Sequence, residues 1–209
     1  MPKIVDHDAR REELLAAVSE VIVRDGLDRV TVRSIAKETG WSSGVLAHYF
    51  ADKDDMITSA LLLAHERIRT RWESKLGGLR GMAALRELVL DNLPLDDERE
   101  RETRLLINYW SGSLPRVDDV TAGEHSWRRG PRLLDQLAEH VAEAQADGTA
   151  ADTEASGDIA ERLLCLIDGM SLHALLDPKR VTRERQLALA TQELDRLAVG
   201  SHAQGDVHA

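Results

Sequence analysis

The sequence predicts an all-α protein of about nine helices, with a three-helix head followed by a larger helical bundle. Apolar residues recur at spacings of three and four from residue 14 to residue 199, which is the period of an amphipathic helix. Glycine, proline and short polar stretches separate these segments and mark helix ends. No segment shows the apolar–polar alternation of a strand, and no internal repeat is found.

The first periodic segment predicts a helix that ends near Gly26. Its apolar residues fall on one face, and they are Leu14, Leu15, Val18, Val21 and Ile22. A helix with one apolar face must bury that face against other elements. We expect it to pack across the two short helices that follow and so to complete the head.

Residues 31–50 predict two short helices joined by a tight turn. Thr31 can cap the first helix, because its hydroxyl can accept from a free backbone N–H one turn later. Gly40 can take the positive φ that ends a helix at low steric cost. Ser42 offers the N-cap of the second helix, and Asp52 offers that of the long helix after it. The apolar residues of the pair are Val32, Ile35, Ala36, Val45, Leu46 and Phe50.

The second short helix carries small and polar residues on its outward positions: Ser43, Gly44, His48 and Tyr49. Small residues permit close approach to a groove, and free N–H groups at a helix start can meet a phosphate. His48 and Tyr49 can donate to phosphates or to base edges. Because Arg33 and Lys53 flank the unit with positive charge, the pattern favours binding to duplex DNA.

The rest of the chain predicts longer helices and their connections. A helix over residues 53–76 ends at Gly77-Gly78, and Thr182 caps the last helix. Residues 147–157 are small and polar and predict a linker, and residues 201–209 predict a disordered tail. The other predicted helices cover residues 82–93, 98–110, 126–146, 159–176 and 182–199, and Pro94, Pro115 and Pro178 lie in the breaks between them.

Residues 31–53 resemble the DNA-binding region of the TetR family of transcriptional regulators. The residues that carry the resemblance are Thr31, Val32, Ile35, Ala36, Gly40, Trp41, Ser42, residues 44–50 and Lys53. Trp41 departs from the pattern, which usually has a smaller aliphatic turn residue. Ala47 stands where many members have an aromatic residue that touches phosphate. A small residue before His48-Tyr49-Phe50 is similar to the branch of the choline-responsive BetI repressors, as is the stretch around Asp168-Gly169.

The resemblance implies a DNA-binding domain over residues 1–52 and a ligand-binding and dimerisation domain over residues 53–200. It also implies a homodimer, formed through residues of about 158–176 and 182–199, on a palindromic double-stranded DNA operator. A small-molecule effector, apolar or cationic, would release this repressor from DNA. We expect base contacts from Ser43, Gly44 and His48, and the wider DNA-binding set adds Thr31, Arg33, Ser42, Tyr49 and Lys53.

Four of the seven aromatic residues lie behind the head, namely Trp72, Tyr109, Trp110 and Trp127. The resemblance implies that their helices line the ligand cavity, and tryptophan faces attract quaternary ammonium groups. Packing of the core accounts for the same residues equally well. Met170 and His173 lie three residues apart on one helix and can face either the cavity or a second subunit.

The charge, the cysteine count and the absence of long apolar runs limit which function classes are compatible with the sequence. The 209 residues carry a formal net charge of −10, although residues 29–53 hold four basic side chains against two acidic ones. Bulk attraction to DNA is therefore weak and sensitive to salt. The single cysteine, Cys165, excludes an intramolecular disulfide, and neither a membrane span nor a signal peptide is found. These features favour a cytoplasmic location, with no cofactor and no metal site.

Two alternatives stay open. The first keeps the DNA-binding head but makes the protein a sensor-less or activating regulator. The second is a helical-bundle enzyme or small-molecule carrier. Catalysis is not expected, because Gly169-Met170-Ser171-Leu172-His173 lacks the second glycine and the preceding strand of a nucleophile elbow.

Overall fold

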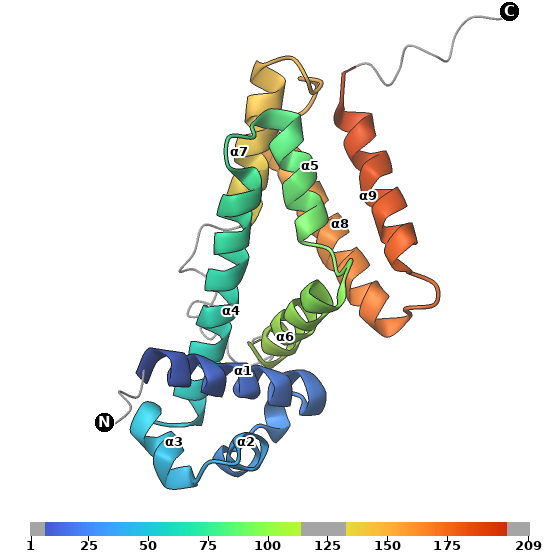
Figure 1. Cartoon of the computed structure of the whole chain (residues 1–209). Coiled ribbons are helices and arrows are strands. Elements are labelled where there is room, and N and C mark those ends of the chain that lie inside the picture. The colour runs from blue at the N-terminus through green and yellow to red at the C-terminus, as the bar shows by residue number, and fades with distance from the viewer. Residues whose placement is uncertain (1–6, 114–132, 200–209) are drawn as a thin grey trace, which may run out of the picture. The chain divides into compact units, whose positions relative to one another are not determined.

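The computed structural model describes residues 7–113 and 133–199, and within these ranges the chain forms α-helices, one short 3₁₀ helix and no strand (Figure 1). One isolated backbone bridge joins Ala150 and Ala198. The elements are α1 (His7–Asp25), η1 (Leu27–Arg29), α2 (Val32–Thr39), α3 (Ser43–Tyr49), α4 (Lys53–Leu76), α5 (Gly81–Asp91), α6 (Asp97–Ser113), α7 (Leu133–Ala146), α8 (Ser156–Leu176) and α9 (Arg183–Leu197). The predicted all-α class is confirmed.

Most helices begin and end close to their predicted bounds. α4 covers the predicted range, α5 ends before Pro94, and α9 begins after Thr182, whose side chain accepts from Arg185 N. α6 runs from Asp97 to Ser113, a little longer than its apolar pattern predicts. The first residues of the helix predicted over 126–146, including Trp127, and the loop between Pro115 and Gly123 lie outside the described residues.

Hydrogen bonds fix residues 147–157, which the sequence predicts as a linker, to the end of α7. Gln145 Nε2 donates to the backbone oxygen of Glu154 at 2.8 Å, and Thr149 N donates to the oxygen of Ala144 at 2.9 Å. Ala150 is buried, and α8 already begins at Ser156. Small polar residues therefore form a tight connection between α7 and α8 here.

The chain divides into two compact units. We call the first the head unit, and it contains α1–α3, α4 up to Thr70 and α6 from Arg104. The body unit contains α4 from Arg71, α5, α6 up to Thr103, and α7–α9. The division falls inside α4 and α6, so each of these helices contributes residues to both units.

The head unit is built around the apolar face of α1. Leu14, Val18 and Ile22 are buried together with Ile35 of α2 and Leu46 of α3. The same cluster includes residues from the first turns of α4 and one from α6, which are Met56, Ile57, Ala60, Leu61 and Leu105. α1 therefore packs against the short pair as its periodicity predicts.

Local caps fix the short pair. Thr31 Oγ1 accepts from Ser34 N at 3.0 Å, and Ser34 Oγ accepts from Thr31 N at 2.9 Å, which is a reciprocal capping box. Gly40 ends α2 with a φ of 71°, in the left-handed region that favours glycine. Ser42 caps α3, and Asp52 Oδ1 accepts from Asp55 N at 2.8 Å in the first turn of α4. These predicted caps are all confirmed.

The body unit has its own core, formed by α5, α7, α8 and α9. The buried residues include Leu85, Leu88, Leu137, Leu163 and Leu194, at least one from each of these helices. Within residues 7–113 and 133–199, no helix combines the length and the apolar composition needed to cross a bilayer.

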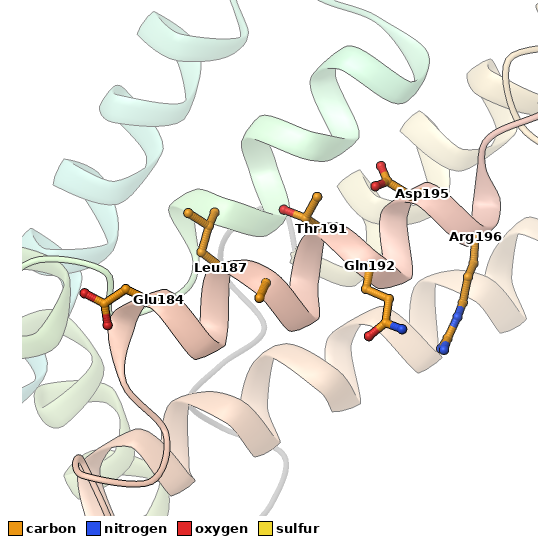
Figure 2. Close-up of a pocket in the computed structure, with 7 residues that line it drawn as sticks. Glu184, Leu187, Thr191, Gln192, Asp195 and Arg196 are labelled. Atoms are coloured by element: carbon orange, nitrogen blue, oxygen red, sulfur yellow. The ribbon is translucent and has the colours of Figure 1, made fainter. Parts of the chain in front are cut away.

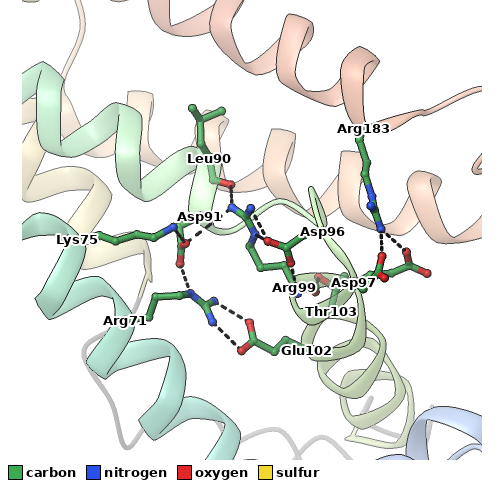
Figure 3. Close-up of polar contacts among 11 residues, drawn as sticks. Arg71, Lys75, Leu90, Asp91, Asp96, Asp97, Arg99, Glu102, Thr103 and Arg183 are labelled. Atoms are coloured by element: carbon green, nitrogen blue, oxygen red, sulfur yellow. Dashed lines mark hydrogen bonds and ion pairs between the residues drawn. The ribbon is translucent and has the colours of Figure 1, made fainter.

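A network of ion pairs joins three helices of the body unit (Figure 3). Asp91, at the end of α5, is only 1% exposed, and its carboxylate accepts from Arg71 Nε at 2.8 Å and from Lys75 Nζ at 2.6 Å. Arg71 also makes two hydrogen bonds to Glu102 of α6, at 2.7 and 2.8 Å. Arg99 pairs with Asp96 at 2.7 Å and donates to the backbone oxygen of Leu90 at 3.3 Å. The network thus fixes the ends of α4, α5 and α6 within this unit.

Candidate nucleic-acid interface

α3 presents one side to the head core and the other to solvent. Leu46 is its only buried residue, while Ser43, Gly44, Ala47 and His48 are exposed. The side chain of Ser42 accepts from Val45 N, so the start of the helix is fixed by its own cap. Three of the predicted outward residues, Ser43, Gly44 and His48, are therefore exposed, whereas the fourth, Tyr49, is half-buried.

Gly44 has no structural role that requires a glycine. A Cβ added there would lie 3.8 Å from Ser42 Oγ, which is an ordinary contact, and its φ is not in the left-handed region. Glycine inside a helix costs about 1 kcal/mol relative to alanine. Because Gly44 has no side chain, another molecule can approach the backbone of α3 closely at this point.

Tyr49 lies on the flank of α3 within an aromatic cluster. Its ring centroid is 6.0 Å from that of Trp41, 5.8 Å from that of His48 and 6.0 Å from that of His7. Its hydroxyl lies 3.4 Å from His7 Nδ1. The ring is thus half-buried by packing, while its hydroxyl lies next to the first turn of α1.

The other predicted contacts surround α3. Thr31 is exposed, but its hydroxyl oxygen is engaged in the cap of α2. Arg33 is exposed and Lys53 is half-exposed, and neither makes an ion pair with any described residue. Arg24, in contrast, pairs with Asp25 at 2.9 Å and with Glu38 at 2.7 Å.

Basic side chains differ between the two units. In the body unit most of them pair with carboxylates, and these are Arg71, Lys75, Arg80, Arg86, Arg99, Arg162, Arg180, Arg183 and Arg196. Within the described part of the head unit, several make no ion pair, and these are Arg10, Arg29, Arg33, Lys37 and Lys53. Unpaired cations therefore gather on the unit that carries α3, although the chain is acidic overall.

The predicted ligand-binding residues are divided between the two units, and one lies outside the described residues. Trp72 and Met170 are buried in the body unit, and the indole Nε1 of Trp72 has no hydrogen-bond partner among the described residues. Tyr109 packs against the core of the head unit, Trp110 is exposed there, and Trp127 lies outside the described residues. His173 is exposed, with its Nδ1 3.4 Å from Arg180 Nη2.

Burial raises the pKa of the Asp168 carboxyl, which has no hydrogen-bond partner among the described residues. Within the described ranges, no group of three or more histidine, cysteine, aspartate or glutamate side chains could hold a metal ion.

α8 and α9 each carry exposed leucine side chains. Leu172 and Leu176 of α8 are 41% and 69% exposed, and Cys165 lies on the same face. On α9, an open groove of about 650 Å³ runs along residues spaced three and four apart (Figure 2). Its lining includes Leu187, which is 45% exposed, and Thr191. No other part of the chain that the structure describes covers these side chains.

The head unit exposes a short capped helix, α3, which follows α2 after a tight turn. This arrangement defines a helix-turn-helix protein, here with a separate helical body. Residues 14–60 match the tetR family of bacterial regulatory proteins. Residues 81–199, more than half of the chain, match the C-terminal region of BetI-type transcriptional repressors. The chain belongs to the TetR family, and its C-terminal region is of the BetI type.

Individual relatives agree with this assignment. The HTH-type transcriptional regulator PksA of Bacillus subtilis is 30% identical over 200 residues, which cover 95% of each chain. BetI of Escherichia coli K12 is 27% identical over 192 residues, which cover 90% of this chain and 94% of the relative. The chain is therefore a transcriptional regulator and not an enzyme, as predicted.

A solved structure supports the same fold. A transcriptional regulator from Saccharomonospora viridis, determined in complex with choline, matches with a TM-score of 0.77 at 21% identity. The match covers 88% of this chain and 95% of that chain.

Proposed function

We propose that the protein is a ligand-responsive repressor that binds a palindromic operator as a homodimer, with α3 of each subunit in a major groove. The observation that carries this proposal is the exposed face of α3, small and polar, flanked by cations that have no carboxylate partner among the described residues. Such a surface can approach base edges while the cations meet phosphates. Because its proposed target is the genome, we also place the protein in the cytoplasm.

Roles follow from the position of each side chain. We propose that Ser43, Gly44 and His48 lie at or near base edges, because they occupy the exposed side of α3. We assign phosphate contacts to Arg33 and Lys53, which are unpaired, and to the Tyr49 hydroxyl. The Thr31 and Ser42 hydroxyls cap the starts of α2 and α3, and Thr31 N already donates to Ser34 Oγ, so we propose that these two residues position the helices beside the phosphate backbone.

A binding assay with the DNA upstream of its own gene tests this proposal. Fluorescence anisotropy with purified protein should give specific binding that weakens as salt rises. The His48→Ala variant should lose discrimination between operator and unrelated DNA, whereas Arg33→Ala should weaken binding to both. Lys179→Ala, an exposed cation of the body unit, is the matched control and should bind as wild type. Unchanged operator binding by a His48→Ala, Tyr49→Ala, Lys53→Ala triple variant would rule out the assignment of these residues.

We propose that two subunits associate through α8 and α9. The exposed leucines and the groove of Figure 2 would be covered by the same surface of a second copy, as a two-fold symmetric interface requires. A Leu172→Glu, Leu187→Glu variant should shift the mass measured by light scattering from dimer towards monomer. Leu62→Glu, at another exposed leucine in α4, should leave the mass unchanged. A monomeric wild type would refute the interface.

We propose that a cationic or apolar molecule is the effector and that it binds in the body unit. The buried Trp72, with its free indole N–H, and the half-buried Asp168 supply an aromatic face and a negative charge there. Thermal shift with choline and with its uncharged analogue 3,3-dimethyl-1-butanol distinguishes the two chemistries. A shift for choline that disappears in Trp72→Leu supports a cationic effector, and a shift for the analogue supports an apolar one. If no effector changes stability or DNA binding, a sensor-less regulator is the better description.

A further inference from the structure

The first turn of α1 lies beside α3, on the flank that carries the half-buried Tyr49 ring. The guanidinium carbon of Arg10 is 5.4 Å from the ring centroid of Trp41, in the turn between α2 and α3. The Trp41 ring in turn packs 6.0 Å from that of Tyr49, and His7 reaches the Tyr49 hydroxyl. One continuous surface therefore contains His7, Arg10, Trp41 and Tyr49.

Arg10 differs from the other arginines of α1 in having no polar partner. Arg11 donates to Ser59 Oγ at 2.9 Å, and Arg24 is neutralised by two carboxylates. Arg10 is exposed, and within the described residues it makes neither an ion pair nor a hydrogen bond. Its charge is therefore free to meet an anion from outside the chain.

Trp41 gives this free charge a fixed position. Trp41 N donates to Thr39 Oγ1 at 3.3 Å, and the half-buried ring packs on the head core. A guanidinium held over an indole face is oriented without being neutralised, because the attraction comes from the ring quadrupole. An arginine that is held in place in this way loses less conformational freedom when it binds.

We propose that Arg10 is a DNA-contacting residue, oriented by Trp41, that binds the phosphate backbone next to the phosphate reached by Tyr49. This inference rests on the proposed function, and it adds the first turn of α1 to the interface. Arg10 lies before residue 14, where the match to the tetR family begins. The contact is to the backbone and carries no sequence information of its own. Trp41 is a positioning residue, since it acts through Arg10.

The salt dependence of operator binding tests this contact. Each phosphate contact contributes about 0.9 to the slope of log K against log salt, so Arg10→Ala in both subunits of a dimer should lower the slope by about 2. Affinity for operator and for unrelated duplex should fall by the same factor. Lys179→Ala is the control for removal of one exposed positive charge.

Substitutions of Trp41 separate positioning from general structure. Trp41→Phe keeps an aromatic face and should retain most of the slope, whereas Trp41→Leu should lower affinity several-fold. Arg10→Ala, Trp41→Leu together should bind no more weakly than Arg10→Ala alone, because Trp41 then has nothing to orient. Circular dichroism melts identify any Trp41 variant that fails to fold, and Arg10→Ala, at an exposed site, remains decisive in that case.

The outcomes are distinguishable. Wild type that binds no DNA refutes the proposed function itself. Wild type that binds, with an Arg10→Ala slope equal to wild type, refutes only the α1 contact. Additive losses from Arg10→Ala and Trp41→Leu refute the positioning role of Trp41, and a non-additive loss with a reduced slope supports the whole proposal.

Discussion

Removal of the Asp91 carboxylate should cost more stability than removal of any exposed carboxylate in the body unit. Asp91 is 1% exposed and accepts charge-assisted hydrogen bonds from Arg71 and Lys75. Arg99 of α6 also lies 3.8 Å from this carboxylate. Asp91→Ala leaves all three cations without this partner, and the loss of one member of a buried pair destabilises by about 3–5 kcal/mol. The perturbation is therefore centred on one buried group that joins three helices.

The expected loss in the free energy of unfolding lies near the lower end of that range. Arg71 keeps its two hydrogen bonds to Glu102, and Lys75 is 40% exposed, so water can solvate it again. We therefore expect a loss of about 3 kcal/mol in the free energy of unfolding. For a chain of this size, each kcal/mol lowers Tm by about 2–4 °C, so Tm should fall by roughly 6–12 °C.

Acid conditions give an independent check on the same group. Burial alone would raise the pKa of Asp91, but the hydrogen bonds from Lys75 and Arg71 outweigh it and hold that pKa below its ordinary value. A depressed pKa in the folded state stabilises the fold above the unfolded pKa of about 4, and this contribution is lost as pH falls further. The difference between wild type and Asp91→Ala should therefore shrink below about pH 4.

Urea denaturation and thermal melts, both followed by circular dichroism, measure these differences. Glu154→Ala is the control, because Glu154 pairs with Arg162 at 2.6 Å but the two side chains are 47% and 43% exposed. Exposed pairs contribute about 0–1 kcal/mol. Equal losses for Asp91→Ala and Glu154→Ala would show that burial does not strengthen this network.

Three further predictions concern single side chains. Glu143 accepts from Gly81 N at 3.1 Å, and this bond, together with those from His140 and Arg80, lowers its pKa to about 2. The ionised carboxylate therefore stabilises the wild type above about pH 4.5, and this contribution is lost between about pH 4.5 and pH 2. Glu143→Gln should lack this contribution, so its free energy of unfolding should be lower than that of wild type at neutral pH and change less over this range in acid titration. Gly40→Ala should lower the free energy of unfolding by about 1–2 kcal/mol in urea melts, because Gly40 has a φ of 71°, which strains the backbone of any residue with a Cβ. A loss below about 0.3 kcal/mol would contradict this strain. Gly44→Ala should keep or raise stability by up to about 1 kcal/mol and yet weaken operator binding in anisotropy, and unchanged binding would contradict close approach at Gly44.

Local chemistry made the head predictable from the sequence. The caps at Thr31 and Ser42, the left-handed turn at Gly40 and the apolar face of α1 depend on neighbours within a few residues. Each of these signals can be read from spacing alone, and each agrees with the structure. The same holds for the start of α9 at Thr182.

Contacts between distant residues could not be predicted in this way. Asp91 meets cations 20 and 16 positions earlier in the chain, and nothing in the local pattern of α5 shows that its last residue is buried. Arg10 lies in α1 and Trp41 in the turn between α2 and α3, and sequence spacing does not indicate that they touch. The predicted ligand-binding residues share the same difficulty, because aromatic residues in long helices serve a core and a cavity equally well.

The pairing of charges explains how an acidic chain can keep a surface for DNA. A cation that is already paired with a carboxylate releases few counterions on binding, whereas an unpaired one releases about one for each phosphate met. Arg33→Gln and Arg86→Gln change the net charge of −10 equally, yet only Arg33 is unpaired among the described residues. We therefore expect Arg33→Gln to reduce the salt dependence of operator binding and Arg86→Gln to leave it unchanged. If both variants reduced it equally, net charge rather than the pairing of individual side chains would control binding.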